Sequence, residues 1–301
     1  MTARMTRLDL TSPTAQSDRM SALPSHPAPS TSAWLRTLLA RPVPAVMGVL
    51  NVTPDSFSDG GQFIAPDEAR ARARAMIADG ADIIDIGAES TRPYKGAQPV
   101  TAEEELRRLK PVLADIVALG VPVSIDSMKS EVVAFALDQG VAIANDVWGL
   151  QRDAGMAPVV AAKKIPVIVM HNRGSVDPAI DIMQDMIAFF QRSLDIAAKA
   201  GIAEDHIVLD PGIGFGKTPE QSITAIARLA ELKSFGLPLL VGASRKRFID
   251  RILPAPPDRR LGGSIAAHLV AVMGGAAIIR AHDVAETVQA LRVAAAIESA
   301  R

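Results

Sequence analysis

Polar side chains that could bind a small molecule appear in this chain where short apolar runs stop. Asp126, Asn145 and Asp210 each follow such a run directly. Two carboxylates and an amide suit a flat nitrogen heterocycle, because a carboxylate accepts two N–H bonds and an asparagine side chain both donates and accepts. The alternative is that they are paired interior polar groups of a large core, which fits any one of them better than all three. We therefore interpret them as groups of one binding site.

A second set of residues supplies hydrogen-bond donors and positive charge, as a phosphate-bearing substrate would need. The set consists of Ser244, Arg245, Lys246, Arg280 and His282. His282 precedes Asp283 and could belong to a helix cap, but its position so soon after Arg280 favours an anion ligand. Arg245 and Arg247 could instead be solvated surface, and this interpretation is favoured for Arg247.

The tripeptide Gly-Lys-Thr at 216–218 has the tail of a phosphate-binding P-loop. That pattern needs a glycine at position 211, where Pro211 has no N–H to offer a phosphate. Thr218 and Gln221 instead have the spacing of a capping box, which predicts that a helix begins here and assigns Lys217 to the helix entry.

Several catalytic classes find no support in the sequence. The chain has no cysteine, which excludes thiolate nucleophiles, and its histidines form no H-x-x-x-H pair for a catalytic zinc. His171 is followed by Asn172 and Arg173, so no neighbouring carboxylate is expected to orient it as a general base. A hydrated magnesium ion recruited with a diphosphate is the expected metal, with oxygen ligands from Asn51 or Asp59.

The elements that must position these residues repeat one unit: an apolar run, a polar or glycine-rich break, an amphipathic helix and a turn. Such runs, apolar on both faces, are typical of buried parallel strands. Eight units at roughly 30-residue spacing predict a single-domain (β/α)8 TIM barrel, with catalytic groups at the carboxyl ends of its strands. A doubly wound open sheet is the alternative, because strand count alone does not prove closure. The expected strands are Ala45–Leu50, Asp82–Ile86, Pro122–Ile125, Val141–Ala144, Pro166–Met170, Ile207–Leu209, Pro238–Val241 and Ala276–Ile279.

Helix boundaries are marked by caps and glycines. Thr101 and Glu104 predict one capping box, and Asp283 with Glu286 predicts the start of the last helix. Six glycines fall just after helical patterns, where a left-handed residue is needed. They are Gly80, Gly120, Gly140, Gly201, Gly236 and Gly275.

Composition bounds the remaining possibilities. The 301 residues are 49% hydrophobic and carry a net charge of −1, which argues against nucleic acid or a charged membrane surface as partner. No apolar run is long enough to span a bilayer. A cytoplasmic location is expected, because a chain without cysteine is compatible with a reducing compartment. Residues 1–33 are rich in Ser, Thr and Pro and predict a disordered tail, which leaves 34–301 for the barrel.

Taken together, the segments that follow the strands resemble the dihydropteroate synthases of folate biosynthesis. The resemblance extends from about Val46 to the C-terminus and touches all eight strand ends. Its segments are N-V-T-P-D-S-F-S-D-G-G from Asn51, E-S-T-R-P from Glu89, S-I-D-S from Ser124, N-D-V from Asn145, M-H-N from Met170, L-D-P-G-I-G-F-G-K-T from Leu209, S-R-K-R-F from Ser244 and R-A-H-D-V from Arg280.

The resemblance implies a magnesium-dependent transferase that acts as a homodimer through its outer helices. Its reaction would join 6-hydroxymethyl-7,8-dihydropterin diphosphate to 4-aminobenzoate, with sulfonamides as mimics of the second substrate. By the same resemblance, the groups nearest the chemistry are Lys246, Arg280, His282 and Asp59. The pterin would be bound by Asp126, Asn145, Met170, Asp210, Lys246 and Arg280, and the diphosphate by Arg280, His282 and Asn51, the last also as metal ligand. The aminobenzoate would contact Phe57, Thr91, Arg92, Pro93, Phe215 and Ser244.

No strong base is expected, because an aniline nitrogen is already neutral. The expected mechanism is a dissociative departure of diphosphate, in which Arg280, His282 and magnesium stabilise the leaving charge and the electron-rich dihydropterin stabilises the cation. One departure from the family pattern is Tyr94-Lys95, which stands where glycine and alanine are common. Two alternatives remain. A pterin-binding methyltransferase would have no need of the loop from Ser90 to Pro93 or of the cations after Ser244, and a non-catalytic paralogue would bind pterin without turnover.

Overall fold

The computed structural model describes residues 31–53, 66–89 and 100–301, and its eight parallel strands close into a barrel in chain order. The first and last strands close the barrel, because β1 is hydrogen-bonded to β8 as well as to β2. The predicted TIM barrel is confirmed, and the open doubly wound sheet is excluded. The strands are β1 Ala45–Asn51, β2 Ile83–Gly87, β3 Val123–Asp126, β4 Ile143–Asp146, β5 Val167–Met170, β6 Ile207–Asp210, β7 Leu239–Val241 and β8 Ala276–Ala281.

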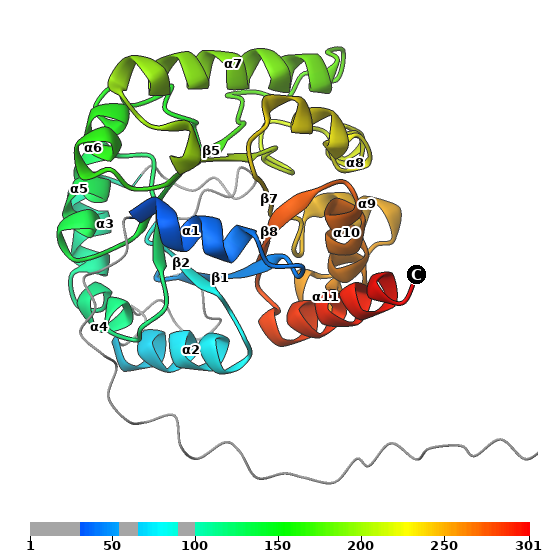
Figure 1. The fold of residues 1–301 in the computed structure, drawn as a ribbon, viewed down its shortest axis with the longest axis horizontal. Coiled ribbons are helices and arrows are strands. Elements are labelled where there is room, and N and C mark those ends of the chain that lie inside the picture. Colours follow the sequence, from blue (N-terminus) through cyan, green and yellow to red (C-terminus); the bar gives the residue numbers. More distant parts are fainter. Residues whose placement is uncertain (1–30, 54–65, 90–99) are drawn as a thin grey trace, which may run out of the picture.

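Helices surround the ring of strands on the outside (Figure 1). The apolar outer faces of the strands and the inner faces of the helices form one continuous core. The α-helices are α1 Thr31–Leu39, α2 Pro66–Ala78, α3 Ala102–Leu109, α4 Leu113–Val117, α5 Ser130–Asp138, α6 Met156–Lys163, α7 Ile182–Ala200, α8 Pro219–Ala227, α9 Arg247–Ile252, α10 Leu261–Met273 and α11 Val284–Ser299; short 3-10 turns are η2 Glu204–His206, η3 Leu229–Phe235 and η4 Pro257–Arg259.

The predicted caps and turns hold for most of these helices. The Thr101 side chain accepts from the N–H of Glu104, and Thr218 and Gln221 form the reciprocal capping box at the start of α8. All six glycines predicted to follow helices have positive φ values. Asp283 is an exception, because its side chain makes no cap bond to α11.

A second, smaller core fills the inside of the barrel. It contains one inward side chain from most strands, among them Met47, Ile83, Ile168 and Val208, together with Leu35 of α1. Helix α1 lies across the ring of strands in Figure 1 and covers this inner core. Sequence composition did not predict α1, which begins three residues before the expected start of the barrel at residue 34.

Among the described residues, no helix combines the length and apolarity that a membrane crossing requires.

Candidate active site

The candidate site residues form the last inward-facing layer at the carboxyl ends of the strands. Side chains alternate between the two faces of a strand, so the inner-core residues fix which positions point inward. Strand register places Asp126 beside Asn145 and Met170 beside Asp210. These residues line one cavity, whose walls are Asp126, Asn145, Val147, Met170, Asp210, Gly212, Ile213, Phe215, Gly242, Lys246 and Arg280.

Arg280 lies in this layer between two carboxylates. Its Nε donates to Asp85 Oδ2 at 2.6 Å and its Nη2 donates to Asp126 Oδ2 at 2.8 Å. Burial disfavours the charged guanidinium, but the Asp85 and Asp126 carboxylates outweigh it and raise the pKa of Arg280. Arg280 therefore stays charged and holds both acids in place.

Asp85 is a site residue that sequence reasoning missed. It is fully buried, and besides Arg280 it accepts from Asn145 Nδ2 at 3.2 Å. The available signal was its position as the single acid inside the apolar run of β2, two residues after the inward-facing Ile83. Asp85 orients the Asn145 amide, so that the amide oxygen is left for another partner.

Among the described residues that line this cavity, two buried acceptor atoms lack a hydrogen-bond partner. They are Asp126 Oδ1 and Asn145 Oδ1, and both residues line the cavity. Burial raises the pKa of Asp126 to about 7, although the Arg280 guanidinium opposes the shift. Buried acceptors are costly without a donor, so this cavity is suited to a ligand with an N–H-bearing edge.

Asp210 is tied to the loop that follows β6. Its Oδ1 accepts from the N–H of Gly212 at 2.8 Å, and burial raises its pKa. Lys246 lies across the cavity, with its ammonium 4.2 Å from the centre of the Phe215 ring. A cation and an aromatic face at the same wall suit a planar, electron-rich ligand.

Ser244 and His282 are brought together at the ends of β7 and β8. Ser244 Oγ lies 3.0 Å from His282 Nδ1 and accepts the backbone N–H of His282 at 3.2 Å. Arg245 is different, because its guanidinium is paired through Nε and Nη2 with the Asp283 carboxylate. Arg245 therefore already has a carboxylate partner, and its expected role as an anion donor stays a prediction. The same pair explains why Asp283 does not cap α11.

His171 corrects another expectation. A carboxylate does orient it, because Asp185 from α7 places Oδ2 3.0 Å from His171 Nε2. Lys217 Nζ lies 2.6 Å from the other ring nitrogen. Burial and the nearby cations lower the pKa of His171 to about 2, so its ring is neutral and is not a general base.

Some expected site residues lie outside the described part of the chain: Phe57, Asp59, Thr91, Arg92 and Pro93, with Tyr94 and Lys95. Asn51 ends β1 on the inward side of the rim. Among the described residues, no three acids or histidines gather as a metal site. One amide oxygen at the rim fits a magnesium ion that keeps its waters and is bound chiefly through a substrate phosphate.

Comparisons with known proteins agree with this geometry. The pattern of the family described as pterin binding enzyme matches residues 47–282. The dihydropteroate synthase of Bacillus subtilis is 45% identical over 79% of this chain and 83% of its own length.

Solved structures extend the comparison. The dihydropteroate synthase of Clostridium difficile, determined in the presence of pteroic acid, has a TM-score of 0.81 at 46% identity and covers 85% of this chain and 97% of its own. That of Xanthomonas albilineans with 4-aminobenzoic acid has a TM-score of 0.82 at 42% identity, with 87% and 94% covered.

The chain forms a closed barrel with a polar, acceptor-lined mouth, and the family pattern matches most of its length. These two findings define it as a pterin-binding enzyme. Within that class the chain belongs to the dihydropteroate synthase family.

Proposed function

We propose that this protein joins 6-hydroxymethyl-7,8-dihydropterin diphosphate to 4-aminobenzoate and releases 7,8-dihydropteroate and diphosphate. The observation that carries the proposal is the pair of unpartnered acceptors, Asp126 Oδ1 and Asn145 Oδ1, in a cavity that also contains Lys246 and Arg280. The amino-pyrimidine edge of a pterin supplies the N–H donors that these atoms lack.

In the proposed reaction, the bond between the pterin methylene carbon and the diphosphate oxygen breaks first. The electron pair leaves with the diphosphate, and the electron-rich dihydropterin stabilises the cation that remains. The lone pair of the aniline nitrogen then forms the C–N bond, and the nitrogen loses a proton to water. Arg280, His282 and Lys246 would stabilise the departing negative charge, which is where preorganised cations contribute most.

Magnesium is the proposed cofactor, recruited with the diphosphate. Asn51 would hold it at the rim, with Asp59 as a second candidate. When bound, it would supply positive charge that neutralises the leaving group.

The loops after β1 and β2 are proposed to close over the aminobenzoate and exclude water from the cation. Support comes from the flanks of the second loop. Glu89 accepts the N–H of Val100 at 3.2 Å and pairs with Lys129 at 2.5 Å, which brings both ends of the loop to the rim near Asp126.

Incorporation of radiolabelled 4-aminobenzoate into dihydropteroate tests the proposed function directly. We expect incorporation that requires the pterin diphosphate and magnesium together. A methyltransferase would instead pass a methyl group to a corrinoid protein, and a non-catalytic paralogue would bind pterin without incorporation. Either result would refute the proposal, whereas incorporation after chelation of all divalent ions would refute only the magnesium requirement.

We also propose a homodimer through the outer helices, with the cytoplasm as location. Helices α10 and α11 pack side by side and carry exposed apolar side chains. Met273 is 78% exposed and Ile297 is 57% exposed, and Val270 and Val293 are also exposed. An apolar surface of this kind is typical of an interface between subunits.

Sedimentation equilibrium tests the dimer. We expect two copies for the wild type and a monomer for Met273→Asp, because the carboxylate would have to be buried at the interface. Val176→Asp is the matched control, since Val176 is an exposed apolar residue in the loop after β5. A wild type that stays monomeric, or a Met273→Asp variant that stays dimeric, would contradict this interface.

A further inference from the structure

The loop at residues 211–216 forms one wall of the candidate site and lies against the backbone of the preceding βα loop. Gly212, Gly214 and Gly216 have φ values of 62°, 82° and 56°. A Cβ atom on Gly212 would lie 2.0 Å from the carbonyl oxygen of His171, and one on Gly216 would lie 2.4 Å from Cβ of Arg173. Only glycine allows this approach, so the two loops form one packed unit.

Lys217 fills the space between these two loops. Its side chain is buried, and its ammonium nitrogen lies 3.0 Å from the Gly212 carbonyl oxygen, 3.1 Å from that of Phe215 and 2.6 Å from His171 Nδ1. Burial lowers the pKa of Lys217 to about 7. Its charged form has three N–H donors, and three acceptors within the protein are placed to accept them. Lys217 therefore has no donor left for a phosphate, although it stands in a Gly-Lys-Thr sequence.

The His171 ring lies between Lys217 and Asp185 and contacts each of them through one ring nitrogen. A neutral imidazole has one donor and one acceptor, so the contact with Lys217 makes Nδ1 the acceptor and leaves Nε2–H to donate to Asp185. Asp185 also pairs with Arg173, at 3.2 Å. The result is a chain of contacts from Asp185 through His171 to Lys217.

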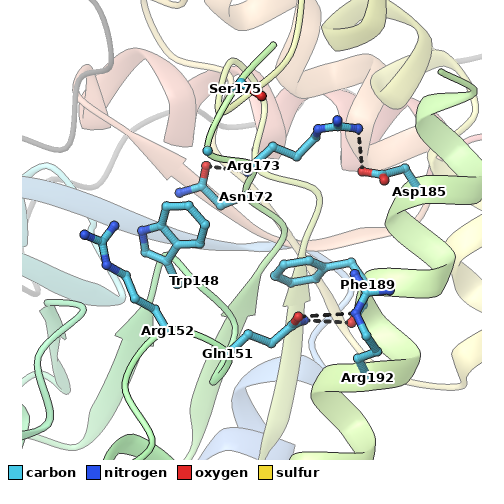
Figure 2. Close-up of a pocket in the computed structure, with 10 residues that line it drawn as sticks. Trp148, Gln151, Arg152, Asn172, Arg173, Ser175, Asp185, Phe189 and Arg192 are labelled. Carbon is cyan, nitrogen blue, oxygen red and sulfur yellow. Dashed lines mark hydrogen bonds and ion pairs between the residues drawn. The ribbon is translucent and has the colours of Figure 1, made fainter. Parts of the chain in front are cut away.

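Asp185, at the outer end of this series of contacts, lines an open cleft beside the candidate site. Figure 2 shows Asp185 with Arg173 at one side of the cleft, and Trp148 and Phe189 near its middle. The three guanidinium groups of the cleft have partners within it: Arg152 lies over Trp148, Arg173 pairs with Asp185, and Arg192 lies over Phe189.

Gly212 connects Lys217 to the pterin-binding layer. Its carbonyl oxygen accepts from Lys217, while its N–H donates to Asp210 Oδ1. The Phe215 carbonyl is bound by Lys217 as well, and the Phe215 ring faces Lys246. One buried ammonium group thus holds the backbone that orients Asp210 and Phe215.

From these contacts we infer that Lys217 is a positioning residue of the proposed reaction, which fixes the loop at 211–216 so that Asp210 and Phe215 meet the pterin. This inference rests on the proposed function. It gives Lys217 a role that differs from both interpretations of its sequence position, which were helix entry and phosphate binding. Removing the ammonium group leaves two carbonyl groups and an imidazole nitrogen without their donor, and the loop shifts to find new partners.

Lys217→Met tests this role, because methionine keeps the approximate length of the chain and removes its three donors. We expect kcat/KM to fall about 100-fold, the loss that a misplacement near 1 Å can cause. We expect pteroic acid, measured by calorimetry, to bind more weakly as well. Lys199→Met is the matched control, since Lys199 is an exposed lysine near the end of α7.

Activity is divided by the fraction of folded protein from circular dichroism, so that lost protein is not counted as lost function. A purely structural role would lower the melting temperature but leave the KM values and the pteroic acid affinity of the folded fraction unchanged, and that result would overturn the inference. Binding of pteroic acid is measured without turnover, so the two proposals can fail separately. A wild type that binds pteroic acid but makes no product would refute the proposed reaction. The positioning role of Lys217 would then be judged on the pteroic acid affinity alone.

A pair of variants at His171 covers the case in which Lys217→Met does not fold. His171→Gln retains a side-chain oxygen that can accept from Lys217, whereas His171→Leu does not. We expect the glutamine variant to keep most of the pteroic acid affinity and the leucine variant to lose it. Equal affinities in the two folded variants would overturn the inference.

Discussion

Arg280→Leu is expected to lower the free energy of unfolding by about 3–5 kcal/mol, because it leaves two buried carboxylates without their counter-ion. Asp85 is fully buried and Asp126 nearly so, and both accept from the same guanidinium group. We expect turnover of the remaining folded protein to fall at least about 100- to 1000-fold, as when a preorganised donor to a developing charge is removed. Chemical denaturation and steady-state kinetics measure the two effects separately.

The double variant Arg280→Leu/Asp85→Asn is the control for this interpretation. If unpaired charge causes the instability, the neutral asparagine should recover part of the lost free energy of unfolding, and the two substitutions should be non-additive. Turnover should not recover, because the cation that faces the leaving group is still missing. Additive stability losses, or full activity in Arg280→Leu, would contradict the assigned role of Arg280.

Asp126→Ala is expected to weaken pterin binding by about 1.5–3 kcal/mol, the range for a hydrogen bond to a charged group. This corresponds to about a 10- to 100-fold rise in Kd. The affected atom is Oδ1, which is buried and has no partner among the described residues. Calorimetric titration with pteroic acid measures the change, and Ser299→Ala on the exposed end of α11 serves as the control.

The pH dependence of binding gives an independent test of Asp126. Burial raises its pKa to about 7, in a setting that includes Arg280, Asp85, Glu105 and Lys246. Only the ionised form accepts N–H bonds at both oxygens, so pterin affinity should fall as the pH drops below about 7. Asp126→Asn should remove this dependence, and the same pH profile in that variant would assign it to another group.

The free energy of unfolding of the ligand-free protein should depend on pH in the opposite direction to the pterin affinity: the Asp126 contribution rises as the pH drops. A carboxyl group whose pKa is raised by folding binds more protons in the folded state than in the unfolded state. Its contribution to the free energy of unfolding is therefore complete below about pH 4 and is lost as the pH rises through about 7.

Much of the fold could be predicted from the sequence because the barrel repeats one pattern. Strands buried on both faces read as uninterrupted apolar runs, and β1 to β8 fall within two residues of their expected positions. Asp126, Asn145 and Asp210 were identifiable because each ends such a run, and closure of the barrel brings these ends together.

The interactions that the sequence did not reveal join residues from different elements. Asp185 lies on α7, 14 positions after His171, and no local spacing rule connects the two. Arg245 and Asp283 are 38 positions apart, so Asp283 was assigned to a helix cap and Arg245 to the anion site, and their pairing was not foreseen. Asp85 lies inside a strand instead of at its end, where only the inward alternation distinguishes it from its apolar neighbours.

A crystal structure of the protein with pteroic acid would test the central claim most directly. We predict that the pterin ring lies in the barrel mouth, with its N–H groups within hydrogen-bond distance of Asp126 Oδ1 and Asn145 Oδ1. A pterin ring bound in the cleft beside Trp148, or a barrel mouth in which these two oxygens stay unbound, would contradict it.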